Sequence, residues 1–192
     1  MTDTTVNPAD LLSSLIDTCL KAGASDADAS FGRSQGVSVE VRGGELESIE
    51  RSESQGVSLR CFFGQQQASV SGSDTSADGL KALAERCVAM ARAVPEDPYC
   101  GLAPTEDLAR DMPELDLTGD GEIAADTQER EAVEAEAAAL AVPGVKQVSS
   151  CGNGWSESER WVAASNGFAA YKKGGSTGLG LAAVAERDGK ME

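Results

Sequence analysis

The clearest pattern in the chain is an alternation of apolar and polar residues between positions 36 and 73. A period of two is typical of strands that bury one face. The apolar members of this pattern are Val37, Val39, Val41, Val57, Leu59, Cys61, Phe63, Ala68 and Val70. They predict an antiparallel meander of about four strands, whose apolar face must be covered by helices.

Glycine turns divide this meander. Gly43-Gly44 suits the two-residue turn of a tight hairpin, because glycine adopts positive φ without steric cost. Gly64-Gln65 offers a second turn before the last strand. Ile49 falls out of phase with Leu46 and Ser48, so we expect a bulge or an early strand end at that point.

Helical periodicity precedes and follows the meander. Asn7 and Pro8 suit the N-cap and the first position of one helix, and Pro95 ends the other. The two apolar stripes are Leu11, Leu12, Leu15, Ile16, Cys19 and Leu20, and then Leu80, Leu83, Ala84, Cys87, Val88 and Ala91. With a first strand over residues 27–33, we expect an α+β domain over residues 1–95, in which both helices pack on one face of an antiparallel or mixed sheet.

The chain changes character after this domain. Residues 96–121 are rich in proline and acidic residues and predict a connector. Residues 126–140 favour a helix with a narrow apolar side at Val133, Ala137 and Leu140. The apolar side chains expected to hold the connector to a surface are Tyr99, Leu102, Leu108, Met112, Leu115 and Leu117.

Strand patterns fill the rest of the chain from Gly144 onward. The expected strands cover residues 145–155, 159–164, 168–172 and 179–186, with a hairpin turn at Asn166-Gly167. Asp188-Gly189 is a second hairpin turn without a second strand, so we expect that a longer protein has been cut here. Residues 122–192 are therefore predicted to be a helix plus the start of a second, β-rich domain.

The charge excludes some classes of partner. Sixteen basic residues against thirty-two acidic ones give a formal net charge of −16, which repels nucleic-acid phosphates and anionic membranes. No stretch approaches the roughly 20 apolar residues that span a bilayer. The N-terminus has neither the basic start nor the apolar run of a signal peptide, so we expect a cytoplasmic protein without direct nucleic-acid or membrane partners.

Four carboxylates on the predicted helix are the nearest approach to a metal site. Glu129, Glu131, Glu134 and Glu136 lie close in sequence, but the chain contains no histidine. Alternating glutamate and alanine is far more typical of a solvated helix than of a metal site. The absence of histidine also excludes Ser-His-Asp and Cys-His catalysis within these residues. We therefore predict no catalytic, cofactor-binding or metal-binding residue in this chain.

Glycine and cysteine motifs are also weak signals. Gly178, Gly180 and Ala183 match the spacing of a dinucleotide fingerprint, but no βαβ pattern surrounds them, and a glycine-rich hairpin is preferred. Residues 174–177 lack the lysine of a phosphate-binding loop. The cysteines form an odd set without a close pair, which argues against a disulfide framework. Cys19, Cys61 and Cys87 are expected in the core, whereas Cys100 and Cys151 are expected to be accessible.

Three stretches resemble a known family. Residues 42–60 (RGGELESIERSESQGVSLR) are similar to the N-terminal domain of the TldD/PmbA family, and residues 89–103 (AMARAVPEDPYCGLA) to its segment after the second helix. Residues 164–168 (ASNGF) resemble the hairpin that opens its second domain. The details are closer to the PmbA (TldE) branch than to the TldD branch.

The resemblance implies a function that the residues alone do not give. Family members are cytoplasmic proteins of more than twice this length, historically labelled modulators of DNA gyrase. TldD and TldE form a zinc-dependent metalloprotease that processes or degrades small or unfolded peptides. The zinc ligands lie on TldD in a His-Glu-x-x-x-His motif of the second half of the chain. The expected partner is therefore a TldD-like subunit, which carries the zinc, or a second copy of this chain.

Four hypotheses follow. The first is a non-catalytic TldE/PmbA-like subunit that contributes to assembly and to the substrate chamber. The second is a zinc peptidase whose own site lies beyond residue 192. The third is a stand-alone binding or scaffold module, and the fourth is a modulator that binds gyrase or DNA, which the charge disfavours. The identity of the peptide substrate and the oligomeric state stay open.

Overall fold

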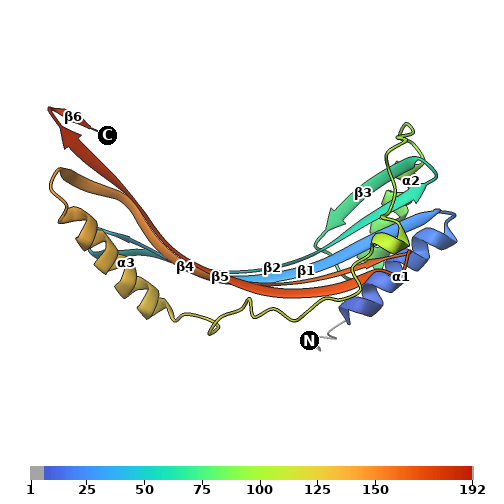
Figure 1. Ribbon diagram of the computed structural model, residues 1–192, viewed down its shortest axis with the longest axis horizontal. Coiled ribbons are helices and arrows are strands. Elements are labelled where there is room, and N and C mark those ends of the chain that lie inside the picture. Colours follow the sequence, from blue (N-terminus) through green and yellow to red (C-terminus); the bar gives the residue numbers. More distant parts are fainter. Residues whose placement is uncertain (1–6, 192) are drawn as a thin grey trace. The chain divides into compact units, whose positions relative to one another are not determined.

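The computed structural model describes residues 7–191 (Figure 1). In chain order the elements are α1 (Pro8–Lys21), β1 (Asp26–Arg42), β2 (Glu45–Phe63), β3 (Gln66–Gly72), α2 (Ala77–Ala91), a 3₁₀ turn (Thr105–Asp107), α3 (Ala125–Leu140), β4 (Val145–Ala164), β5 (Ala169–Arg187) and β6 (Lys190–Met191). The strands form one sheet in the order β3-β2-β1-β4-β5-β6. This antiparallel α+β arrangement confirms the predicted fold class.

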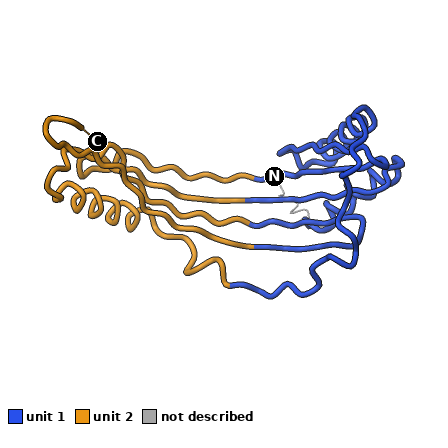
Figure 2. The backbone as a smooth tube through the Cα atoms, turned by 45° about the horizontal axis from the view of Figure 1, so that its top comes forward, with its two compact units in different colours: residues 1–33, 55–115, 159–172 blue, residues 34–54, 116–158, 173–192 orange. Residues whose placement is uncertain are grey.

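The chain divides into two compact units (Figure 2). Unit 1 comprises residues 1–33, 55–115 and 159–172, and unit 2 comprises residues 34–54, 116–158 and 173–192. Strands β1, β2, β4 and β5 contribute residues to both units. Each unit has its own helices and its own buried cluster.

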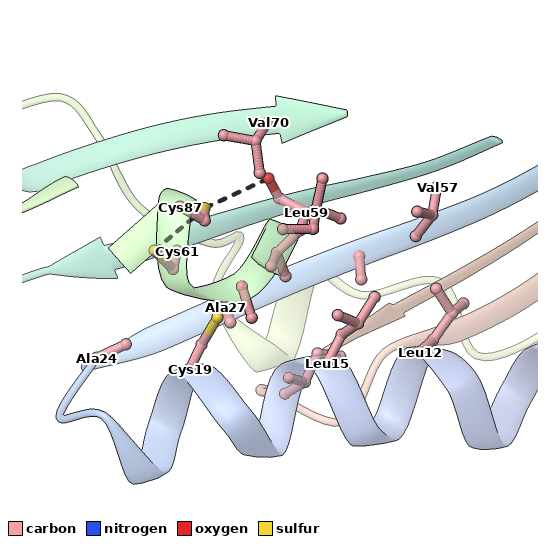
Figure 3. Packing of buried hydrophobic residues seen from close by; sticks show 14 of the residues in the cluster. Leu12, Leu15, Cys19, Ala24, Ala27, Val57, Leu59, Cys61, Val70 and Cys87 are labelled. Atoms are coloured by element: carbon pink, nitrogen blue, oxygen red, sulfur yellow. Dashed lines mark hydrogen bonds between the residues drawn. The ribbon is translucent and has the colours of Figure 1, made fainter. Parts of the chain in front are cut away.

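The core of unit 1 lies between helices α1 and α2 and the sheet. Asn7 caps α1 as predicted, because its side-chain oxygen accepts a hydrogen bond from Ala9 N at 3.1 Å. Figure 3 shows Leu12 and Leu15 of α1 pointing toward the strands. Both are almost fully buried, which stabilises the fold by about 1.5–3 kcal/mol for each leucine. Because α1 and α2 contribute to the same buried cluster, the prediction that both cover one sheet face is confirmed.

Strands β2 and β3 pair so that apolar residues of the predicted pattern lie opposite one another. Leu59 lies opposite Val70, and Cys61 lies opposite Ala68. Their side chains are buried in the same cluster. The turn between the strands is Gly64-Gln65, where Gly64 has a φ of 62°.

In unit 2, α3 packs on β1 and β4, and the predicted apolar side of this helix is correct for Val133, which is half-buried against the core, but wrong for Ala137 and Leu140. Its buried residues are Gln128, Ala132 and Glu136, whereas Ala137 and Leu140 are exposed. Ala132 packs with valines and a cysteine of the sheet, namely Val39, Val41, Val148 and Cys151. The buried Glu136 explains which side of α3 faces the sheet, because its carboxylate accepts hydrogen bonds from main-chain N–H groups of the turn between β1 and β2.

Several strands are longer than predicted. Ile49 does not interrupt β2, and residues 145–164 form one strand instead of two. Similarly, one strand covers residues 169–187, and the expected first strand over residues 27–33 is the start of β1. The meander therefore has three strands, of which β1 and β2 are long and β3 has seven residues. The turn at Asp188-Gly189 is followed by β6, which pairs with the end of β5, so the prediction of a missing second strand is wrong.

The connector over residues 96–121 is held differently from the prediction. Leu102 and Leu108 are half-buried, but Tyr99 is 95% exposed and Leu115 is 62% exposed. Main-chain hydrogen bonds attach the connector instead, as from Asp97 N to Gln65 O at 2.7 Å. No helix described between residues 7 and 191 is long and apolar enough to cross a membrane.

Candidate functional site

Glu136 forms the most specific polar contact of unit 2. Its carboxylate accepts two hydrogen bonds from the turn between β1 and β2, with 2.9 Å from Gly43 N to Oε1 and 2.6 Å from Gly44 N to Oε2. Both glycines have positive φ, and this conformation presents their N–H groups to one carboxylate. The Glu136 side chain is only 2% exposed. The contact is therefore a structural clamp between α3 and the hairpin.

The other carboxylates of α3 have separate surroundings. Glu131 accepts a hydrogen bond from Asn153 Nδ2 at 2.9 Å, and Glu134 is exposed and pairs with Arg130. Glu129 is half-buried. Within residues 7–191, no three His, Cys, Asp or Glu side chains converge as metal ligands would. The prediction of a solvated helix face is correct for Glu134 but wrong for Glu136.

The glycine motifs near the C-terminus lie inside β5. Residues 174–177 and 178–183 are continuous strand, so the predicted glycine-rich hairpin is wrong at this place. A close approach of the connector accounts for Gly175: its N–H donates to Leu117 O at 2.7 Å. A Cβ at this position would lie 3.2 Å from Ser156 O and 3.3 Å from Thr118 O. The glycine is therefore needed for packing.

Unit 2 carries a shallow pocket of about 380 Å³. Serine hydroxyls from four strands line it, together with Thr177, the neighbouring glycines and two apolar residues: Ser38, Ser52, Ser156, Ser176, Gly36, Gly154, Gly178, Val37 and Trp155. Two of these hydroxyls, on Ser156 and Ser176, are hydrogen-bonded at 2.9 Å. Because its lining contains no ionisable side chain, the pocket suits a neutral, hydrogen-bonding ligand. The sequence analysis did not predict this pocket. Glycine and serine recur two residues apart in three of its strands, as Gly36 and Ser38, Gly154 and Ser156, and Ser176 and Gly178, and this repeat could have indicated it.

Unit 1 has a cluster of aromatic and charged residues on β1, β4 and β5. Glu159 pairs with Arg33 and accepts a hydrogen bond from Tyr171 Oη at 2.6 Å. The Trp161 ring lies 4.8 Å from the Tyr171 ring and 5.8 Å from the Phe31 ring. The Arg33 guanidinium lies 5.4 Å from the Trp161 ring, within the range of a cation–π contact. Glu159 is thus occupied by two donors and not poised as a general base.

The cysteines follow the prediction with one exception. Cys19, Cys61 and Cys87 are fully buried, and Cys100 is half-exposed. Cys151, which was expected to be accessible, is buried against α3, and its thiol donates to Ala132 O at 3.2 Å. Burial raises the pKa of the Cys151 thiol, and the nearby Glu136 carboxylate adds to this effect. Cys151 is therefore a protonated core thiol.

These contacts define binding and structural features. Histidine is absent from the sequence, and within the described residues 7–191 no group of His, Cys, Asp or Glu side chains could hold a metal ion. What the surface offers is hydroxyl groups and main chain in unit 2 and an aromatic cluster in unit 1.

Two family models match the chain. Residues 27–91 match the model described as PmbA/TldA metallopeptidase domain 1. Residues 120–192 match the PmbA/TldA metallopeptidase central domain.

Curated relatives carry the same family name. The chain is 33% identical over 125 residues to the metalloprotease PmbA homolog of Haemophilus influenzae, which covers 65% of this chain and 28% of the relative. It is 32% identical over 122 residues to metalloprotease PmbA of Escherichia coli O157:H7, covering 63% of this chain and 27% of the relative. The matched region is thus less than a third of each curated relative.

Solved structures share the fold. A protein of Bacteroides thetaiotaomicron described as a DNA gyrase modulator superposes with a TM-score of 0.84 at 19% identity, over 94% of this chain and 42% of that one. TldE from Thermococcus kodakarensis superposes with a TM-score of 0.78 at 18% identity, over 94% of this chain and 40% of that one. With two family models in the family's own domain order and two PmbA relatives, the chain belongs to the PmbA/TldD metallopeptidase family and represents its N-terminal part.

Proposed function

We propose that this chain is the N-terminal region of a PmbA/TldE-like subunit in a zinc-dependent metalloprotease that processes or degrades small or unfolded peptides. In this proposal it contributes to assembly and to the walls around the substrate, and a TldD-like subunit supplies the catalytic zinc. The single observation that carries the proposal is the pair of consecutive family models, supported by the PmbA names of both curated relatives.

The residues of this chain do not fit a catalytic zinc site. Zinc in peptidases is bound by histidine nitrogens together with carboxylate oxygens, and this sequence has no histidine. The best-placed buried carboxylate, Glu136, already accepts hydrogen bonds from Gly43 and Gly44. We therefore assign no step of zinc chemistry to these residues.

The pocket of unit 2 supports a substrate-facing role. Extended peptides expose main-chain N–H and C=O groups whatever their side chains, and hydroxyl groups can donate to or accept from both. Ser38, Ser52 and Ser176 present such hydroxyls beside glycines that leave room for an approaching main chain. The absence of charged side chains in the lining favours binding that depends little on peptide sequence.

A reconstitution assay tests the proposal. Cleavage of a fluorogenic unstructured peptide is measured for the protein that carries this chain, for a TldD-type subunit, and for their mixture, each with and without a zinc chelator. We expect cleavage in the mixture and its loss with chelator. Chelator-sensitive cleavage by the protein alone would contradict the non-catalytic role and favour a zinc site beyond residue 192.

A pair of matched variants tests the substrate-facing role separately. Ser52→Trp fills the pocket, whereas Ser48→Trp places the same bulk on β2 at an exposed position outside the lining. We expect Ser52→Trp to reduce cleavage by the mixture at least about threefold, which corresponds to about 0.7 kcal/mol, with little effect of Ser48→Trp. Equal effects of both variants would remove the pocket from the proposal and leave the partner role standing.

The gyrase label of the structural neighbours leads to a different expectation. A DNA-binding modulator should bind DNA with an affinity that falls steeply with salt. At a net charge of −16 we expect no such binding. A gel-shift titration at low salt tests this point.

A further inference from the structure

Three of the five cysteines meet in the core of unit 1. Cys19 of α1, Cys61 of β2 and Cys87 of α2 are each 0% exposed. The Cys61 thiol donates a hydrogen bond to Cys87 Sγ across 3.3 Å (Figure 3). Cys19 lies in the same buried cluster. The fold thus brings three free thiols that are far apart in the sequence into one buried cluster.

The sulfur atoms of Cys61 and Cys87 lie close together. A disulfide has a sulfur–sulfur bond of about 2.04 Å, so an approach of about 1.3 Å would bring the two atoms to bonding distance. The two residues belong to different elements, and α2 packs at the surface of the unit, against β3 and α1. Closing this distance requires a shift of α2 or a change of side-chain rotamer.

We propose that Cys61 and Cys87 form a reversible disulfide when unit 1 is exposed to a hydroperoxide, and that this bond fastens α2 to β2. The proposal is independent of the peptidase role and concerns the stability of unit 1.

The hydrogen bonds assign a role to each thiol. Cys87 Sγ accepts the hydrogen bond from Cys61, and in the closed core it donates its own proton to main-chain carbonyls, with 3.3 Å to Ala68 O and 3.6 Å to Leu59 O. The bond accepted from Cys61 lowers the pKa of Cys87, so Cys87 is the thiol of the pair that ionises more readily once α2 opens and acts as the nucleophile. The neighbouring Cys19 thiol, the hydrogen bond to Cys87 and burial raise the pKa of Cys61. Cys61 therefore keeps its proton until it attacks in the second step.

The reaction balances with hydrogen peroxide as the oxidant. The Cys87 thiolate attacks one peroxide oxygen, the O–O bond breaks, and the products are the Cys87 sulfenic acid and hydroxide, which takes up the proton that Cys87 released to form water. Cys61 sulfur then attacks Cys87 sulfur, the S–O bond breaks, and the departing hydroxide takes the Cys61 proton to form a second water molecule. Two thiols are oxidised, and one peroxide is reduced to water. A small thiol such as dithiothreitol reverses the bond by exchange.

Burial sets the rate of this reaction. Because both sulfurs are fully buried, oxidation requires a local opening of α2. Cys100 is half-exposed in the connector and serves as an internal reference. We expect the pair to oxidise more slowly than Cys100 in the native chain, and we expect both cysteines of the pair to lose their thiols together.

The test uses the whole chain in its native state. It is incubated with hydrogen peroxide, then unfolded in denaturant with an alkylating agent, and analysed by intact mass and peptide mapping. We expect a cross-linked peptide that joins Cys61 to Cys87 and has lost two hydrogen atoms, with Cys61 and Cys87 unalkylated in addition to the oxidised Cys100. Dithiothreitol should restore both alkylation sites.

Variants separate the two roles. In Cys61→Ala, Cys87 should proceed to the sulfinic acid, and in Cys87→Ala, Cys61 should stay alkylatable. Cys100→Ser and Cys19→Ala should leave the cross-link unchanged, and circular dichroism verifies that each variant is folded. Full alkylation of Cys61 and Cys87 after Cys100 has been oxidised, or a cross-link that contains Cys19, would overturn the proposal.

Discussion

Replacing Glu136 by alanine should destabilise unit 2 strongly. The substitution removes both hydrogen bonds to the Gly43-Gly44 turn and leaves space beside Ala132 in the packed face of α3. A hydrogen bond to a charged group contributes about 1.5–3 kcal/mol, so two of them set an upper value of about 6 kcal/mol. Since the turn itself is exposed and water can reach its N–H groups, we expect a loss of about 2–4 kcal/mol in the free energy of unfolding.

The two tryptophans allow this loss to be measured in one unit. Trp155 is buried in unit 2, and Trp161 lies in unit 1. In a Trp161→Phe background, urea unfolding followed by tryptophan fluorescence reports unit 2 through Trp155 alone. Glu134→Ala is the matched control, because Glu134 is exposed on the same helix and its replacement should change stability by no more than about 0.5 kcal/mol.

Two results would refute this reasoning. Equal unfolding midpoints for Glu136→Ala and Glu134→Ala would show that the clamp contributes nothing beyond helix propensity. In Glu136→Gln the amide replaces one acceptor oxygen by a donor that faces an N–H group, so we expect a loss of stability. A Glu136→Gln variant as stable as the unsubstituted chain would show that the second acceptor and the charge are unimportant.

Three further predictions concern single positions. Burial raises the pKa of the Cys151 thiol above its ordinary value of 9.0. The neutral thiol therefore contributes its full stabilisation of the folded state below pH 9.0, and this contribution declines as the pH rises through the raised pKa. Alkylation of Cys151 in the native chain at pH 8.5, measured by mass spectrometry, should be much slower than that of Cys100. Gly175→Ala should destabilise unit 2 by about 1–3 kcal/mol, because the new methyl group meets two main-chain oxygens; Gly178→Ala points into open space and should be nearly neutral in the same urea assay. Asn7→Ala should cost about 0.5–2 kcal/mol through loss of the α1 cap, and calorimetry that finds an unchanged melting temperature would contradict this cap role.

The fold could be predicted from the sequence where the burial of one face gives the apolar residues a regular spacing. Val37, Val39 and Val41 alternate because one face of β1 is covered, and the leucines of α1 follow a helical period for the same reason. The first half of β2 was misread at Ile49 because residues 45–55 are exposed on both faces. A strand without a buried face needs no alternation of apolar and polar residues, so the sequence could not show that the strand continues.

The orientation of α3 could not be read from its own residues. Its composition favoured Val133, Ala137 and Leu140 as the buried side, but a contact with a turn more than ninety residues away buries Glu136 instead. Cys151 was misplaced for the same reason, because it is α3 that covers it. The pocket of unit 2 likewise depends on the order of four strands, which no local pattern contains. The domain boundaries at residues 95 and 121 and the cytoplasmic location stay predictions.

The central claim is that this chain belongs to a subunit that enables a zinc-bearing partner. Its most direct test is to titrate the protein that carries this chain into a fixed amount of a TldD-type subunit and to record both the rate of peptide cleavage and the zinc content of each separated subunit. The account predicts that cleavage rises and saturates at an equimolar ratio, with zinc found on the partner only. Zinc on the protein that carries this chain, or a partner whose activity is unchanged by the addition, would contradict it.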